Sequence, residues 1–158
     1  MKLKYPQNSL NLLLTDDDID DRFFFEKALK EIPIASNLVV VNNGEELMDY
    51  LARNTDNLPD VLFLDLSMPR KTGYECLIEI KEDEKLKKLP VIMFSTSFTH
   101  GVGLEESLKN TLFKMGAQDY IRKPGDFKKL KQVIHQALIR VIEKDNLIDE
   151  EKSDKSIK

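Results

Sequence analysis

The segment LFLDLSMPRKTG, residues 62–73, decides the fold because it ends a run of apolar residues on a carboxylate and then turns at a proline. An acidic side chain at the end of a buried strand loses hydration, which is costly unless cations or hydrogen bonds compensate it. Asp65 therefore needs partners from elsewhere in the chain. We interpret the segment as a strand whose carboxyl end contributes to a polar site.

Apolar runs alternate along the chain with segments of helical periodicity, which is typical of a parallel sheet covered by helices on both faces. The expected strands are short, apolar and bounded by polar residues, Pro or Gly: Leu10 to Thr15, Leu38 to Val41, Val61 to Asp65, Val91 to Ser95 and Asp119 to Arg122. The expected helices lie between and after them: Asp20 to Glu31, Glu45 to Arg53, Tyr74 to Glu82, Leu104 to Met115 and Asp126 to about Lys144. The pattern predicts an α/β domain of five strand–helix units.

The last expected helix carries one apolar stripe at three-and-four spacing: Leu130, Val133, Ile134, Ala137, Leu138, Val141 and Ile142. This stripe serves either the core or a partner, so a homodimer through the last two helices stays open. Residues 145–158 are charged and poor in apolar side chains, and we expect a frayed or disordered tail there. Residues 1–7 are expected to be an N-terminal extension of a single domain spanning residues 8–144.

The composition is that of a soluble globular protein of about one domain, with 158 residues, 41% of them hydrophobic and 33% charged. A net charge of −4 argues against general nucleic-acid binding and against attraction to anionic lipid, since both need a basic surface. No apolar run or secretory signal indicates membrane insertion or export. Because Cys76 is the single cysteine, no internal disulfide is expected. We therefore expect a cytoplasmic protein.

Polar side chains follow the expected strands at the points where the strands end. Asp16 and Asp17 follow the first strand and Asp65 ends the third. Ser95 and Lys123 occupy the ends of the fourth and fifth. Since the carboxyl ends of parallel strands share one edge of the sheet, we expect these residues to converge there.

The expected cluster has the chemistry of a phosphoryl site that uses a divalent cation. Three carboxylates at close range cannot all stay ionised without a counter-cation, and oxygen ligands without nearby His or Cys suit Mg²⁺. Lys123 would pair with an anion and Ser95 would donate a hydrogen bond. Asp65 would be the nucleophile, because an aspartate carboxylate can accept a phosphoryl group as an acyl phosphate.

The sequence resembles the receiver domain of two-component response regulators over roughly residues 8 to 144. The resemblance rests on four motifs in the family's order: LLLTDDD, LFLDLSMPRKTG, PVIMFSTS and DYIRKP. Each motif alone has a simpler interpretation; the aspartates at 16–18, for example, are also typical of a solvated turn or helix cap. Their conjunction favours the phosphoryl site. The resemblance implies a doubly wound, flavodoxin-like sheet of five parallel strands in the order 2-1-3-4-5.

The resemblance also implies roles for the matched acidic residues. Asp65 corresponds to the phosphorylated aspartate, and Asp16 and Asp17 correspond to the metal-binding pair. The backbone carbonyl of Ser67 would be a further Mg²⁺ ligand.

Three other matched residues would respond to the phosphoryl group. Ser95 corresponds to the switch hydroxyl, with its neighbour Thr96 as the alternative, and Tyr120 to the aromatic that moves inward with it. Lys123 corresponds to the phosphate-pairing lysine, and its bond to Pro124 is usually cis in the family.

The segment between Ser95 and Lys123, containing FTHGVGLEESLKN, departs from the family because it is several residues longer than usual. An unusual shape is therefore expected for the fourth helix and the loop before it. No output domain follows the last helix, so the resemblance implies a stand-alone receiver.

The leading hypothesis is a signalling protein that is phosphorylated on Asp65 by a histidine kinase or phosphotransfer protein and then changes its contacts with other proteins. Its own chemistry would be limited to accepting the phosphoryl group and slowly hydrolysing it. One alternative is a receiver-like interaction module that works without phosphorylation. Another is a Mg²⁺-dependent phosphatase with an aspartate nucleophile, which is disfavoured because Ser67 stands where such enzymes have a second Asp.

Overall fold

The computed structural model describes residues 9–96 and 102–156 of the chain. Its strands form one parallel sheet in the order β2-β1-β3-β4-β5, which confirms the order that the resemblance implies. The strand bounds are β1 (Leu10–Thr15), β2 (Ser36–Val41), β3 (Val61–Leu64), β4 (Val91–Ser95) and β5 (Asp119–Arg122). The helix bounds are α1 (Ile19–Glu31), α2 (Gly44–Arg53), α3 (Gly73–Glu82), α4 (Val102–Lys114) and α5 (Phe127–Ser156).

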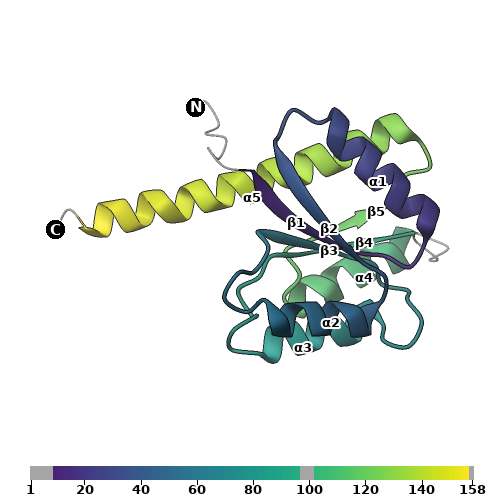
Figure 1. Ribbon diagram of the computed structural model, residues 1–158, viewed down its shortest axis with the longest axis horizontal. Helices are drawn as coiled ribbons and strands as arrows, with labels where there is room; N and C mark the ends of the chain where they lie inside the picture. The colour runs from purple at the N-terminus through teal and green to yellow at the C-terminus, as the bar shows by residue number, and fades with distance from the viewer. Residues whose placement is uncertain (1–8, 97–101, 157–158) are drawn as a thin grey trace.

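The sheet separates two hydrophobic cores because successive strand side chains point to opposite faces. Figure 1 shows α1 and α5 covering one face and α2, α3 and α4 covering the other. On the α1–α5 face, Phe25, Phe63 and Phe94 meet edge to face with ring centroids 5.0 to 6.1 Å apart. The opposite core contains aliphatic side chains of β1, β3 and β4 together with those of α2 and α3. Both faces of the central strands are therefore fixed by packing.

The register brings the carboxyl ends of the strands into line. Thr15 is opposite Leu64, and Ser95 is opposite Arg122. Backbone hydrogen bonds continue one residue beyond these pairs, from the Asp65 N–H to the Thr15 carbonyl at 3.1 Å and from the Lys123 N–H to the Ser95 carbonyl at 2.9 Å. The backbone atoms of the predicted site residues are thus held by the sheet.

Helix α5 extends to Ser156, so the prediction of a frayed or disordered segment after Lys144 is wrong for the residues described. The chain contains no Gly or Pro after Gly125, and Lys and Glu in the segment after Lys144 have good helix propensity. Figure 1 shows the last turns of α5 projecting beyond the sheet. None of the described helices is long and apolar enough to cross a membrane.

The apolar stripe of α5 belongs to the core of this chain. Its buried members are Leu130, Ile134, Ala137, Leu138, Val141 and Ile142. A homodimer through α5 would therefore have to use other residues, such as Leu147, whose side chain is exposed. The expected N-terminal extension at residues 1–7 lies outside the described residues, as do residues 97–101 of the segment before α4.

The loop between β3 and α3 passes so close to its own beginning that only glycine fits at residue 73. A Cβ atom there would lie 2.2 Å from the backbone oxygen of Asp65 and 2.9 Å from the Cα of Leu66. The Gly73 N–H donates to the Leu66 carbonyl at 3.0 Å, which closes the loop. Helix α3 therefore begins directly against the backbone that carries Asp65.

We predict that Gly73→Ala lowers the free energy of unfolding by about 3 kcal/mol, because the new methyl group collides with backbone that cannot rotate away. Chemical denaturation of the purified variant measures the loss. Gly125→Ala is the matched control, since a Cβ there has nothing within 4 Å. Equal stability losses for the two variants would contradict the steric explanation.

Candidate functional site

Lys123 forms the centre of a charged cluster at the carboxyl edge of the sheet. Its Nζ lies 2.7 Å from Asp16 Oδ2, 3.0 Å from Asp21 Oδ2 and 3.5 Å from Asp65 Oδ2. The side chains of Lys123, Asp16 and Asp65 are 8%, 1% and 9% exposed, so these charges interact with little screening by water. The ammonium group also lies 5.5 Å from the centroid of the Phe94 ring.

The predicted metal-binding carboxylates are close enough to share one cation. Asp16, Asp17 and Asp65 each offer an oxygen, and these oxygens lie within 4.8 Å of one another. Asp17 is exposed while the other two are buried, so the cluster is open to solvent on one side. This all-oxygen donor set with an open side fits Mg²⁺, which retains several waters when it binds to proteins.

The cluster has an excess of negative charge, and burial makes that charge costly. Burial raises the pKa of Asp65 to about 6, although Lys123 acts in the opposite direction, and Asp16 raises this pKa further. Burial likewise raises the pKa of Asp16. Burial alone would lower the pKa of Lys123, but its hydrogen bond to Asp16 and the nearby carboxylates raise that pKa instead. Lys123 is therefore charged, and the carboxylates favour a further cation.

The structure brings the predicted hydroxyl and loop residues to the same edge. Ser95 is buried and its hydroxyl acts to lower the pKa of Asp65, whereas Thr96 is exposed, so burial favours Ser95 as the hydroxyl of the site. The Ser67 N–H donates to Asp65 Oδ1 at 3.3 Å. Tyr120 is buried in the core between the sheet and α2–α4.

The sequence analysis missed Asp21, which lies in the first turn of α1 and contacts Lys123. Asp18 caps this helix, as an acidic residue at its start would predict, and its side chain accepts from the Asp21 N–H. The available signal was the position of Asp21 in the first turn of a helix that begins soon after β1, which places its carboxylate near the carboxyl edge of the sheet. The Lys123–Pro124 bond is trans in the structure, so the expected cis bond is not found; the two forms of an X–Pro bond differ little in free energy.

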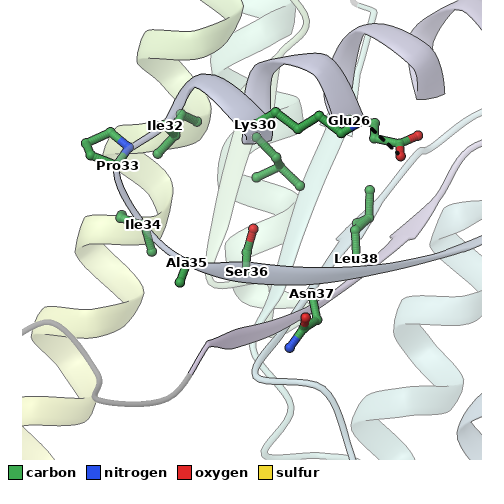
Figure 2. A pocket seen from close by; sticks show the side chains of 10 residues that line it. Glu26, Lys30, Ile32, Pro33, Ile34, Ala35, Ser36, Asn37 and Leu38 are labelled. Atoms are coloured by element: carbon green, nitrogen blue, oxygen red, sulfur yellow. Dashed lines mark ion pairs between the residues drawn. The ribbon is translucent and has the colours of Figure 1, made fainter.

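A cavity also lies away from this cluster. It has a volume of about 610 Å³ and is found between the end of α1 and the beginning of β2. Figure 2 shows its lining, in which Ile32, Pro33 and Ile34 come from the connecting loop and Lys30 pairs with Glu26. Its lining has no group of carboxylates like the one around Lys123. We therefore take the Lys123 cluster, and not this cavity, as the candidate functional site.

We predict that Asp65→Asn raises the free energy of unfolding by about 1 to 3 kcal/mol in metal-free buffer near neutral pH. A carboxyl group whose pKa is raised on folding takes up its proton in the native state first. Its unfavourable contribution therefore disappears as pH falls from about 7 to about 4, and the difference between native protein and variant should shrink over this range. Denaturation curves at several pH values measure the difference.

Asp49→Asn is the matched control for this experiment, because it removes the same charge from an exposed position on α2. It should leave stability nearly unchanged. Adding Mg²⁺ should stabilise the native protein and the control but not Asp65→Asn. A destabilised Asp65→Asn variant in metal-free buffer would refute the charge imbalance.

Comparison with known proteins agrees with this geometry. Residues 12–135 match the family model of the response regulator receiver domain. The chain is 32% identical over 136 residues to the two-component response regulator ARR15 of Arabidopsis thaliana, a match that covers 79% of this chain and 62% of ARR15. The chain therefore spans less than two thirds of that relative.

Two solved structures share the fold. The phosphorylated cyanobacterial phytochrome response regulator RcpA has a TM-score of 0.70 at 30% identity, covering 82% of this chain and 91% of that one. The Mn²⁺-bound form of response regulator Rcp1 has a TM-score of 0.68 at 26% identity, covering 80% and 90%. Because the family match extends over most of the chain and includes most of β1 and all of β2 to β5, this protein belongs to the response regulator receiver domain family.

Proposed function

We propose that this protein accepts a phosphoryl group on Asp65 from a histidine kinase or histidine phosphotransfer protein and thereby changes its contacts with other proteins. The observation that carries the proposal is the buried Asp65 carboxylate within reach of Lys123 and of two further carboxylates that suit a divalent cation. A cytoplasmic setting is part of the proposal and is consistent with its single, buried cysteine.

The reaction would be a direct phosphoryl transfer. An oxygen of Asp65 attacks the phosphorus, the bond from phosphorus to the donor histidine nitrogen breaks, and the imidazole leaves with the electron pair. Lys123 pairs with the phosphoryl oxygens, and Ser95 donates a hydrogen bond to one of them. Mg²⁺ held by Asp16, Asp17, Asp65 and the Ser67 carbonyl would neutralise charge on the transferring group. Slow hydrolysis of the acyl phosphate would return the protein to its starting state.

The response to phosphorylation would be a shift between two packings of the β4–β5 region. The added group brings negative charge and acceptor oxygens, which favour any arrangement that draws Ser95 and Lys123 onto it. Tyr120 lies on β5 beside β4, so its ring can follow a movement of Ser95. The output is a changed surface around Tyr120 and the helices on either side of β5.

Two of the similar structures support the proposed phosphorylation and metal binding. RcpA is a phosphorylated response regulator, and Rcp1 was solved with Mn²⁺, which prefers the same oxygen ligands as Mg²⁺. Here the equivalent chemistry is proposed for the cluster around Asp65.

The surface nearest the site supports a protein as the phosphoryl donor. Helix α1 exposes three large apolar side chains: Ile19, Phe23 and Phe24 are 73%, 60% and 43% exposed. Phe24 also lines a cavity of about 240 Å³ that includes Lys123 and Phe127. Exposed apolar groups gathered beside a reactive site are typical of a protein-binding surface.

We predict that incubation with acetyl phosphate and Mg²⁺ adds one phosphoryl group to the native protein and none to Asp65→Asn. Intact-mass measurement detects the adduct, and peptide mapping locates it. Asp49→Asn should label like the native protein, and a chelator should prevent labelling. A native protein that stays folded and unlabelled would refute the proposal and favour a module that works without phosphorylation.

We predict that Phe23→Ala slows phosphoryl transfer from a phosphorylated histidine phosphotransfer domain by about tenfold, because the variant loses apolar contact with the donor. Its labelling by acetyl phosphate should be unchanged, since that small donor needs no docking surface. Phe113→Ala removes a ring that is 39% exposed from α4 and is the control. If both variants accept the group from the protein donor at the native rate, α1 is not the docking surface.

A further inference from the structure

The ammonium group of Lys123 has three hydrogen-bond donors, and the structure gives them unequal partners. The contacts with Asp16 at 2.7 Å and Asp21 at 3.0 Å are short charge-assisted hydrogen bonds. The contact with Asp65 at 3.5 Å is at the limit of a hydrogen bond. Two donors thus have short contacts, and the third is directed at Asp65 over a longer distance.

Asp21 differs from the other carboxylates near Lys123 in what else it can bind. Asp16, Asp17 and Asp65 form the cluster whose oxygens lie within 4.8 Å of one another, and Asp21 is outside it. Its side chain is 38% exposed, so the carboxylate keeps contact with water while it binds the ammonium group. Asp21 therefore contacts the lysine without taking part in the metal-binding set.

The position of Asp21 is fixed by the start of α1. Its backbone N–H donates to Asp18 Oδ1 at 3.0 Å, which is the N-cap hydrogen bond of the helix. The backbone of the next residue, Arg22, donates to the Asp18 carbonyl at 3.1 Å. The carboxylate thus extends from a rigid first turn, which suits a group that positions another side chain.

We propose that Asp21 is a positioning residue that holds the Lys123 ammonium group with one donor directed at the place where a phosphoryl oxygen on Asp65 would lie. The inference rests on the proposed function. A cation that is already oriented loses little entropy when it binds the transferring group, so it accelerates transfer more than a mobile one. When Asp16 oxygens bind a divalent cation, Asp21 still holds the lysine.

The test compares phosphorylation rates with acetyl phosphate at saturating Mg²⁺. In this reaction an Asp65 oxygen attacks phosphorus, the phosphorus–oxygen bond to the acetyl group breaks, and acetate leaves with the electron pair. We expect Asp21→Ala to label about tenfold more slowly, and Asp21→Asn, which keeps an acceptor oxygen, to lose less. Asp20→Ala is the matched control, because it removes the same charge from the same helical turn and is exposed. It should remain within about twofold of the native rate.

A double-mutant cycle tests whether the effect passes through Lys123. In a Lys123→Ala background, adding Asp21→Ala should change the rate little, because the group that Asp21 positions has gone. Equal slowing in both backgrounds would overturn the inference, and so would equal rates for Asp20→Ala and Asp21→Ala.

These results separate the inference from the function on which it rests. A native protein that labels on Asp65 while Asp21→Ala matches Asp20→Ala keeps the proposed function and overturns only the role of Asp21. A folded native protein that does not label overturns both. Thermal unfolding of each variant confirms that rates are compared between folded proteins.

Discussion

The buried ion pairs of Lys123 are the interaction on which the rest of the site depends. One ammonium group compensates carboxylates from β1, α1 and the end of β3, and it reaches them from the end of β5. Removing such a cation would leave buried negative charges without a partner, which is far more costly than losing a surface ion pair. The lysine therefore connects strands that are distant in sequence at the point where chemistry is proposed.

The single positive charge of Lys123 does not balance the negative charge of the surrounding carboxylates, and this imbalance favours binding of a further cation. The raised pKa values of Asp16 and Asp65 show that burial of their charge outweighs the attraction of one lysine. A site in this condition favours added cations, so a divalent ion bound there would also stabilise the fold. A phosphoryl group would change the same balance in the opposite direction, so a local charge can shift the packing of β4 and β5.

The scaffold supplies the rigidity that this balance requires. Aromatic rings on the α1–α5 face and aliphatic side chains on the other face hold the central strands, and backbone hydrogen bonds extend to Asp65 and Lys123 themselves. The β3–α3 loop returns against the Asp65 backbone at Gly73. Under the proposed function, the side chains of Ser95 and Tyr120 would move while the backbone that carries Asp65 stays in place.

The sequence by itself determined the five strands and their approximate ends, because strand periodicity is a local property of the chain. It also determined the convergence of Asp16, Asp65 and Lys123, because the strands of a parallel sheet end at the same edge. Only the tertiary structure decided that Asp21 contacts Lys123, that the stripe of α5 packs inside the chain, and that α5 continues to Ser156. Those outcomes depend on distances between elements and on competition among burial, hydration and helix propensity, which no local pattern encodes.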